Sequence, residues 1–289
     1  MPTATSYRGR LAPSPTGYLH LGHARTFWVA YQRARAAHGK LIFRNEDLDL
    51  QRSKPRFVEA MYEDLRWLGL DWDEGPDAGG AFGPYNQSQR RDFYLRAWQR
   101  LRDGGFIYPC TCSRKDLASA LAAPHEDDDE FAYPGTCRRT LRLAKDWEAP
   151  EGVSWRFKVP DGKAIGFRDL NSGEQRFVAG EDFSDFLIWR RDDVPAYQLA
   201  VIVDDAAMQI SEVVRGADLL KSTARQLLLF DALGAAPPMY FHCPLLRDAG
   251  NVRLAKRHDA LSLRTLRAQG VEAQSLQERF AREIPWDNL

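Results

Sequence analysis

Two histidines stand three positions apart, directly behind a loop rich in proline and glycine. The segment reads APSPTGYLHLGHAR, residues 12–25, with Gly22 between His20 and His23. Side chains three apart share one face in the first turn of a helix, and a helix N-terminus favours phosphate groups. Imidazoles there could hydrogen-bond an α-phosphate and stabilise the charge that builds on it, while Gly22 would leave room for a flat ring. A histidine pair alone would indicate an ordinary helix, but the preceding PSPTG favours phosphate chemistry.

A second group of reactive side chains is a cluster of cysteines. Cys110, Cys112 and Cys137 fall within 28 residues, and in a cytosolic chain such a cluster indicates metal binding before disulfides. Three thiolates leave a closed tetrahedral zinc site one ligand short, and His125 is the chemically conventional fourth ligand. Three buried free cysteines are the alternative. Cys243 stands apart in an apolar segment and is predicted to be a core residue.

The elements expected around the two histidines alternate between strand and helix. A strand ends at the Pro/Gly loop, and apolar side chains then follow helical spacing up to Gly39. Residues 40–49 form a short apolar strand that ends in polar groups. A helix follows, with Ser53 as its cap and Pro55 in its first turn. This order predicts a parallel sheet with right-handed crossovers.

The order of elements changes after the first hundred residues. Residues 109–194 hold the cysteine cluster, an acidic run and the strand-like segments VSWRFKVP and FLIWRR, and are predicted to be an insertion. AYQLAVIVDD then resumes the sheet as a strand that ends in Asp204 and Asp205 at the carboxyl edge, where ligands bind in open α/β folds. A helix capped by Ser222 or Thr223 follows.

The last segments complete the expected fold. MYFHCPLLRD is predicted to be a strand in which His242 is structural, and ALSLRTLRAQGVEAQSLQERFAREI is predicted to be helical. With 40 basic and 40 acidic residues, the net charge of zero gives no support for coating long nucleic acids. The first residues hold no signal-type apolar stretch, and no apolar run is long enough to span a membrane. We therefore expect a cytoplasmic protein.

The segment PSPTGYLHLGHAR resembles the HIGH-type signature of class I aminoacyl-tRNA synthetases, in its glutamyl/glutaminyl version. The second signature of that family, KMSKS, corresponds to RLAKR at residues 253–257, with Arg253, Ala255 and Arg257 departing from the pattern. Lys256 matches the second lysine and would grip the triphosphate as charge moves onto pyrophosphate. Without the first signature, this basic loop would be interpreted as a solvated surface.

The resemblance implies an α/β fold: a Rossmann-type parallel sheet with an inserted zinc-containing α+β domain and a short C-terminal helical segment. It divides the chain into a first half of the catalytic domain, the inserted acceptor-binding-type domain, a second half with the KMSKS-like loop, and the helical segment, at residues 1–108, 109–194, 195–257 and 258–289.

The resemblance also implies the substrate residues. Arg10 would bind the side-chain carboxylate of glutamate as a bidentate fork, and Glu46 would accept its ammonium. The glutamate site would be completed by Ala12, Ser14, Tyr197 and Arg215, and the ATP site would comprise His20, Gly22, His23 and Lys256.

Ordinary structural roles compete with three of these assignments. Glu46 and Asp47 could belong to a helix-capping acidic loop. Without the family, Tyr197 would be a half-buried strand aromatic and Arg215 a surface residue.

The resemblance also bears on the metals. The block YPGTC matches the family, so Tyr133 is favoured over His125 as the fourth ligand beside Cys110, Cys112 and Cys137. One structural Zn²⁺ would hold the inserted domain together, and Mg²⁺ is expected with ATP.

The length of the chain bears on the acceptor. Only 32 residues follow Arg257, enough for about two helices, so no anticodon-reading domain is expected. Shortened glutamyl-type members of the family convert L-glutamate and ATP to glutamyl adenylate without tRNA. They then transfer the glutamate to the queuosine base in the anticodon loop of tRNA(Asp). We expect that activity, in a monomer.

Three alternatives stand beside this expectation. The first is a catalytic fragment of a glutamyl-tRNA synthetase that charges a tRNA 3′ end. The second is a non-catalytic paralogue that binds tRNA or glutamate, suggested by the altered RLAKR loop. The third is a different nucleotidyltransferase that shares HxGH.

Overall fold

The computed structural model describes residues 6–112, 133–139, 144–246 and 262–283. The RLAKR loop with Lys256, and His125, lie outside the described residues. Short 3₁₀ helices connect the larger elements, at Gln87–Gln89, Thr136–Arg139, Ala144–Asp146 and Ala217–Leu219.

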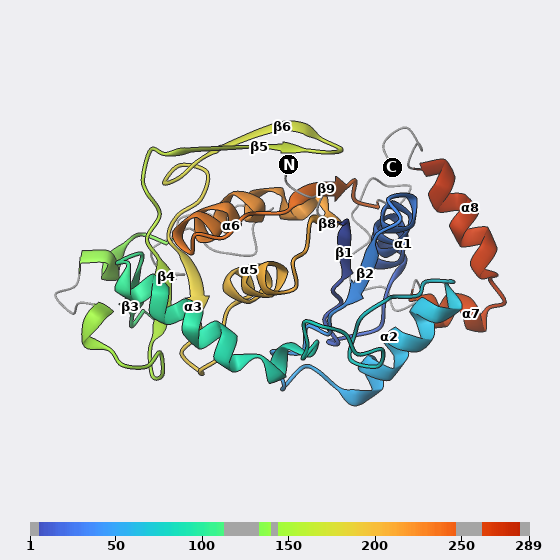
Figure 1. The fold of residues 1–289 in the computed structure, drawn as a ribbon, viewed down its shortest axis with the longest axis horizontal. Coiled ribbons are helices and arrows are strands. Elements are labelled where there is room, and N and C mark those ends of the chain that lie inside the picture. Colours follow the sequence, from blue (N-terminus) through green and yellow to red (C-terminus); the bar gives the residue numbers. More distant parts are fainter. Residues whose placement is uncertain (1–5, 113–132, 140–143, 247–261, 284–289) are drawn as a thin grey trace.

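The first two strands of the protein belong to a layer of parallel strands. Strand β1 (Arg8–Leu11) pairs in parallel with β2 (Lys40–Phe43), and β8 (Glu212–Gly216) pairs in parallel with β9 (Met239–Cys243). Figure 1 shows β1 between β2 and β8, and the Ser211 N–H donates to the Arg8 carbonyl at 2.9 Å. The predicted strands before and after the first helix are therefore confirmed, and so is their parallel pairing.

Two helices follow the first two strands. Helix α1 (Leu21–Ala36) packs against the strand layer, and α2 (Pro55–Trp67) follows β2. Pro55 opens α2 as predicted, because proline suits the first position of a helix. The predicted Ser53 cap is wrong: Lys54 precedes the helix and no side chain caps it.

The insertion forms a second sheet and a long hairpin. Strand β3 (Ile107–Cys110) pairs antiparallel with β4 (Ser154–Phe157), which pairs antiparallel with β7 (Phe186–Trp189). The hairpin of β5 (Ala164–Asp169) and β6 (Gly173–Val178) reaches back and joins the edge of β9. Figure 1 shows it running along one long side of the molecule. The two strands predicted within the insertion are confirmed as β4 and β7.

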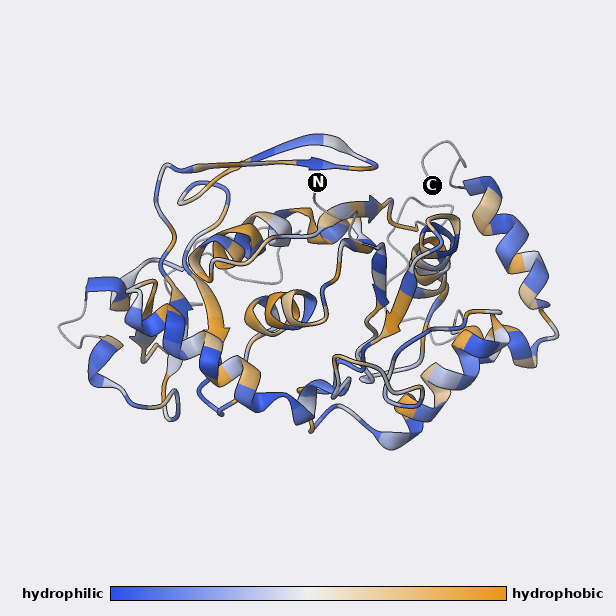
Figure 2. Ribbon diagram, viewed as in Figure 1, coloured by the Kyte–Doolittle hydropathy of each residue, from blue (hydrophilic) through white to orange (hydrophobic). Residues whose placement is uncertain are grey.

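Helices occupy the region between the two sheets. Helix α3 (Arg91–Asp103) and helix α6 (Leu220–Ala232) pack around α5 (Tyr197–Ala207), and Figure 2 shows α5 to be largely apolar. Of the strand material predicted from AYQLAVIVDDAAMQISEVVRG, the EVVRG end is confirmed as β8, but the strand predicted from AYQLAVIVDD is wrong, because that segment is α5. Its apolar run contacts protein on several sides, so periodicity alone could not distinguish a buried helix from a buried strand. Helix α6 also begins before Ser222 and Thr223, which face inward instead of capping it.

The C-terminal helices lie beside the first ones. Helix α7 (Leu263–Ala268) contacts α2, and α8 (Ala273–Glu283) packs on α1, as Figure 1 shows. The helical tail predicted from the sequence is confirmed as these two helices. In the described segments, no helix has both the length and the apolar character needed to cross a bilayer.

Candidate active site

The two histidines lie at the start of α1. His20 precedes the helix, and its Nδ1 accepts from the backbone N–H groups of Gly22 and His23, at 3.0 and 3.4 Å. The rings of His20 and His23 stack with their centroids 3.7 Å apart. A Cβ on Gly22 would come within 3.0 Å of the His20 ring, so this glycine makes room for the histidine itself. The pair therefore shares one face at a helix N-terminus, where an anion is favoured.

The loop between β1 and α1 is tied to the segment after β2. The backbone N–H of Glu46 donates to the Pro13 carbonyl at 3.0 Å, which continues the parallel pairing beyond the strand ends. In this loop Ala12 is half-buried and Ser14 is exposed. The loop thus holds Glu46 beside the chain that leads to the histidines.

Strand β1 carries Arg10 into the interior. Its Nη1 donates to the Val214 carbonyl at 2.8 Å, and its Nε lies 3.7 Å from Asp205 Oδ1. Among the described residues, Arg10 Nε finds no hydrogen-bond partner. Burial lowers the pKa of Arg10, Asp205 opposes the shift, and Arg44 adds to it. A buried guanidinium with an unused donor favours an anionic ligand.

Glu46 is held by the arginine two positions before it. Arg44 Nη2 donates to Glu46 Oε1 at 3.1 Å, and its Nη1 donates to Asp205 Oδ1 at 2.7 Å. Burial raises the pKa of Glu46, and the charges of Arg44 and Arg10 oppose that shift. The Glu46 side chain therefore lies inside a cluster of buried arginines (Arg10, Arg44 and Arg215, the arginine cluster) and does not cap a helix.

Arg215 lies at the end of β8 and is only 4% exposed, so the surface position expected without the family is wrong. It donates to Thr223 Oγ1 at 2.6 Å, to Gln226 Oε1 at 2.9 Å and to the Tyr197 hydroxyl at 3.4 Å. Tyr197 opens α5 and is 40% exposed. The structure therefore brings Tyr197 and Arg215 together, as the resemblance implies, although Tyr197 lies on a helix and not on a strand.

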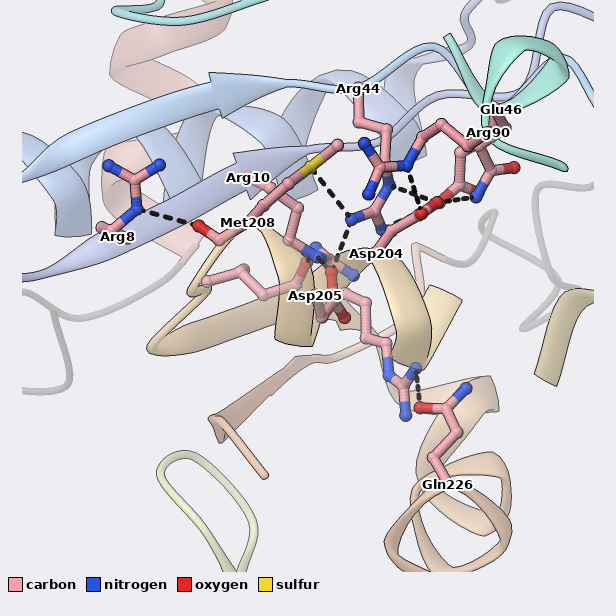
Figure 3. A network of polar contacts seen from close by, with 12 residues as sticks. Arg8, Arg10, Arg44, Glu46, Arg90, Asp204, Asp205, Met208 and Gln226 are labelled. Atoms are coloured by element: carbon pink, nitrogen blue, oxygen red, sulfur yellow. Dashed lines mark hydrogen bonds and ion pairs between the residues drawn. The ribbon is translucent and has the colours of Figure 1, made fainter. Parts of the chain in front are cut away.

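The carboxylates Asp204 and Asp205, predicted at a ligand-binding sheet edge, instead organise this cluster from a helix. Asp204 and Asp205 do not end a strand at the sheet edge, because both lie within α5 and are buried. Asp204 accepts from Arg90 Nε at 2.6 Å, from Gln87 and from the Tyr94 hydroxyl. Figure 3 shows Arg44 flanked by the two aspartates and Glu46, with Arg10 beside Asp205.

A helical interpretation of AYQLAVIVDD would have supplied the missing signal. Adjacent carboxylates inside a buried helix must find cations, and Arg44 follows directly after the buried β2.

The cysteine cluster lies at the end of β3, where the 3₁₀ helix Thr136–Arg139 brings Cys137 beside Cys110. The ligand atoms of Cys110, Cys112 and Cys137 lie within 4.8 Å of one another. The Tyr133 hydroxyl lies 3.5 Å from Cys110 Sγ and 3.7 Å from Cys112 Sγ, and the two sulfurs of Cys112 and Cys137 are 3.5 Å apart. This group could hold a metal ion.

The strand residues His242 and Cys243 are both fully buried in β9. The core position predicted for Cys243 is confirmed.

Comparisons with known proteins agree with this arrangement. The family model described as tRNA synthetases class I (E and Q), catalytic domain, matches residues 6–283. Glutamyl-Q tRNA(Asp) synthetase of Nitratidesulfovibrio vulgaris is 50% identical over 274 residues, which cover 93% of this chain and 83% of that protein. Glutamate–tRNA ligase 2 of Acidithiobacillus ferrooxidans is 44% identical over 282 residues, 97% of this chain and 58% of that protein.

The solved glutamate–tRNA synthetase of Elizabethkingia anophelis has a TM-score of 0.76 at 34% identity, over 87% of this chain and 53% of the other.

Proposed function

Because the chain belongs to the family of class I glutamyl and glutaminyl tRNA synthetase catalytic domains, we propose that it activates L-glutamate with ATP and transfers it to the queuosine base of tRNA(Asp). The acceptor is supported by two relatives named glutamyl-Q tRNA(Asp) synthetase, at 50% and 49% identity. The compared relatives named glutamate–tRNA ligase are less similar to this chain, at 44% identity or less.

The buried arginine cluster carries the proposal for glutamate. Arg10 keeps an unused donor in the interior, and Arg215 lies beside Tyr197 at the end of the neighbouring strand β8. Two guanidinium groups suit a substrate with two carboxylates, and the carboxylate of Glu46 suits its ammonium. Arg44 and Asp205 fix the orientation of Glu46 and Arg10.

The reaction needs two transfers. An oxygen of the glutamate α-carboxylate attacks the α-phosphorus of ATP, and pyrophosphate leaves with its electrons. A hydroxyl of the queuosine base then attacks the carbonyl carbon of the glutamyl adenylate, AMP leaves, and the hydroxyl proton is released. His20 and His23 would contact the α-phosphate from the start of α1, and Lys256 would bind the departing pyrophosphate. Mg²⁺ bound with ATP would neutralise phosphate charge.

We propose Zn²⁺ for the cysteine cluster, with Cys110, Cys112, Tyr133 and Cys137 as ligands. Tetrahedral zinc with thiolate bonds near 2.3 Å places its sulfurs about 3.8 Å apart. The sulfurs of Cys112 and Cys137 are 3.5 Å apart, and those of all three cysteines lie within 4.8 Å of one another. The ion would stabilise the insertion.

The test is glutamate transfer to tRNA(Asp) with and without queuosine. Labelled glutamate should become attached only to the queuosine-containing tRNA, and ATP–pyrophosphate exchange should depend on glutamate but not on tRNA. Labelling of tRNA that lacks queuosine would contradict the proposed acceptor and favour charging of a 3′ end. Absence of exchange by zinc-loaded protein would contradict catalysis and favour a binding function.

A further inference from the structure

A chain of buried hydrogen bonds runs from the β5–β6 hairpin to Arg215. Asp169 is the last residue of β5, and its Oδ2 lies 2.6 Å from His242 Nδ1. On the other side of the ring, His242 Nε2 lies 3.1 Å from Arg215 Nε. Asp169 and His242 are at most 1% exposed. The sequence placed neither residue in the substrate site, so this chain extends the site toward the insertion.

Only one tautomer of His242 satisfies both ends of this chain of hydrogen bonds. Arg215 Nε always carries a hydrogen, so His242 Nε2 must present a lone pair to it. The hydrogen of the neutral ring is then on Nδ1, where it donates to Asp169. The opposite tautomer would set a lone pair against the carboxylate and two N–H groups against each other. Asp169 therefore selects the form of His242 that can accept from Arg215.

The backbone fixes Asp169 independently of the ring. Its Oδ1 accepts from the backbone N–H groups of Asn171 and Ser172 at 3.1 and 2.8 Å, and its carboxylate also faces the backbone N–H of His242. Asp169 pairs with Tyr240 in the only register position between β5 and β9 that the described strands show. The turn of the hairpin thus fixes the position of the Asp169 carboxylate, and the carboxylate fixes the orientation of the His242 ring.

The contacts of Arg215 show what this chain of hydrogen bonds holds in place. A guanidinium has five N–H donors, and Nε points to His242. Thr223 and Gln226 take one donor from each Nη nitrogen at 2.6 and 2.9 Å. The remaining contacts, to the Tyr197 hydroxyl and the Leu219 carbonyl, are long at 3.4 Å. These two weakly bonded donors are the ones that a substrate can take over.

We propose that Asp169 and His242 are positioning residues for glutamate: they anchor the Nε edge of Arg215, so that its donor near Tyr197 points at the substrate. This rests on the proposed function, because it assigns the two residues to the glutamate pocket. It also makes the β5–β6 hairpin of the insertion part of the amino-acid site.

A matched pair of variants separates the two ends of the ring. In His242→Gln the longer side chain can place its amide oxygen near the position of Nε2 and still accept from Arg215. In His242→Asn the amide reaches only the position of Nδ1, next to Asp169. We expect H242N to raise the KM for glutamate about tenfold in ATP–pyrophosphate exchange, with the KM for ATP unchanged. H242Q should stay within about twofold of the wild type.

The variant Asp169→Asn tests the other end of the chain. The amide oxygen can keep the contacts to the backbone N–H groups of Asn171 and Ser172, which turns the NH₂ group toward His242 Nδ1. The ring hydrogen then moves to Nε2, a donor faces Arg215 Nε, and the KM for glutamate should rise as in H242N. Asn171→Ala is the matched control, because Asn171 Nδ2 donates to the His242 carbonyl at 2.8 Å without touching the ring. This variant should keep the wild-type KM.

Three outcomes would overturn the positioning role. One is the same glutamate KM in H242N and H242Q, measured on variants with a cooperative melting transition. Another is an equal rise of the KM in N171A. The third comes from ¹⁵N NMR of the imidazole in substrate-free protein, which should show hydrogen on Nδ1 in the wild type and on Nε2 in D169N. An unchanged tautomer in D169N would contradict the proposed chain.

The same experiments distinguish failure of this inference from failure of the proposed function. A wild-type protein without glutamate-dependent exchange would refute the proposed function together with the role in glutamate binding. Normal exchange with unaffected variants would refute the positioning role alone.

Discussion

At the scale of single residues, the guanidinium groups of the proposed glutamate pocket distinguish a carboxylate from an amide. Arg10 and Arg215 are buried, Arg10 Nε has no hydrogen-bond partner among the described residues, and two donors of Arg215 make only long contacts of 3.4 Å. A carboxylate can accept from such donors with both of its oxygens, whereas the amide of glutamine has one oxygen and an NH₂ group. Hydrogen bonding in the proposed pocket therefore favours glutamate over glutamine.

The variant Arg10→Ala tests this preference for glutamate. We expect it to raise the KM for glutamate by about 100-fold, because a charge-assisted fork to the side-chain carboxylate is lost. The ratio of glutamate to glutamine activation should fall by a similar factor, as measured by ATP–pyrophosphate exchange with each amino acid. Arg35→Ala is the control, since Arg35 pairs with Asp71 and Asp73 near the surface. Unchanged saturation by glutamate in R10A would remove Arg10 from the side-chain site.

Prediction from the sequence succeeded unevenly for these side chains. The motif around His20 and His23 indicated a helix start, and the structure confirms it, because the local spacing alone determines that geometry. Burial of Arg215 could not be inferred in this way. Its partners Thr223, Gln226 and His242 lie on α6 and β9, and no short-range pattern shows that these elements meet around it.

At the scale of elements, the successes and failures follow from periodicity. Segments with one apolar face, such as α1 and α8, or with short apolar runs between polar ends, such as β2 and β9, formed as predicted. Helix α5 did not, because Val201 and Ile202 sit in an apolar run that suits a strand equally well. The tertiary packing of α5 between α3 and α6 decides its structure.

The contact between α2 and α7 makes stability depend on pH through Asp64. Its carboxylate is buried with no hydrogen-bond partner among the described residues, and the nearest cation is Arg264 Nε at 4.0 Å. Burial raises the pKa of Asp64 from 3.8 to about 6, although Arg264 opposes the shift. The folded state therefore binds this proton more tightly than the unfolded state. Ionisation as the pH rises through about 6 destabilises the fold.

The variant Asp64→Asn should remove that penalty. Relative to the wild type, its free energy of unfolding should rise by about 1.4 kcal/mol between pH 5 and pH 8, as measured by urea denaturation. Glu59→Gln changes an exposed carboxylate elsewhere on α2 and should follow the wild-type pH profile. A constant difference between D64N and the wild type across this range would contradict the raised pKa.

The proposed zinc ligands can be tested by substitution and zinc analysis. Purified wild-type protein should contain one zinc per chain by elemental analysis, and Cys137→Ser should lose it and melt at a lower temperature. Tyr133→Phe should keep three ligands and release zinc to a chelator faster than the wild type. Cys243→Ser serves as control, because this buried cysteine lies in β9 away from the cluster. Loss of zinc in C243S, or its full retention in C137S, would contradict the assignment.

At the scale of the whole molecule, the insertion shares one hydrophobic core with helices α3, α5 and α6. Trp155 and Trp189 of the insertion belong to the same buried cluster as Trp98 of α3 and Leu228 of α6, and the rings of Trp98 and Trp155 lie 4.9 Å apart. Strand β3 also spans the predicted boundary at residue 109. Sequence composition could not reveal this shared core, which exists only once distant segments pack together.

The shared core predicts a single unfolding transition. Differential scanning calorimetry should show one endotherm, and release of bound zinc should coincide with it. Trp98→Ala should destabilise the whole protein by about 3–5 kcal/mol, because it opens a cavity between α3 and the insertion. Two separated endotherms, with only one of them shifted by W98A, would instead indicate domains that unfold independently.

The hydrogen bonds at the start of α1 have a consequence for how mutants of His20 must be interpreted. Nδ1 of His20 caps the N-terminus of α1 by accepting from its backbone N–H groups, so the hydrogen of the neutral ring is on Nε2. In the proposed function, Nε2 donates this hydrogen to a phosphate oxygen without protonation of the ring. Removing the side chain would fray the helix and abolish that donor together, and the two losses would be indistinguishable in a rate. Asparagine, a strong helix cap, supplies an oxygen close to Nδ1 and nothing at Nε2. The helix cap and the proposed phosphate contact at this position are therefore genetically separable.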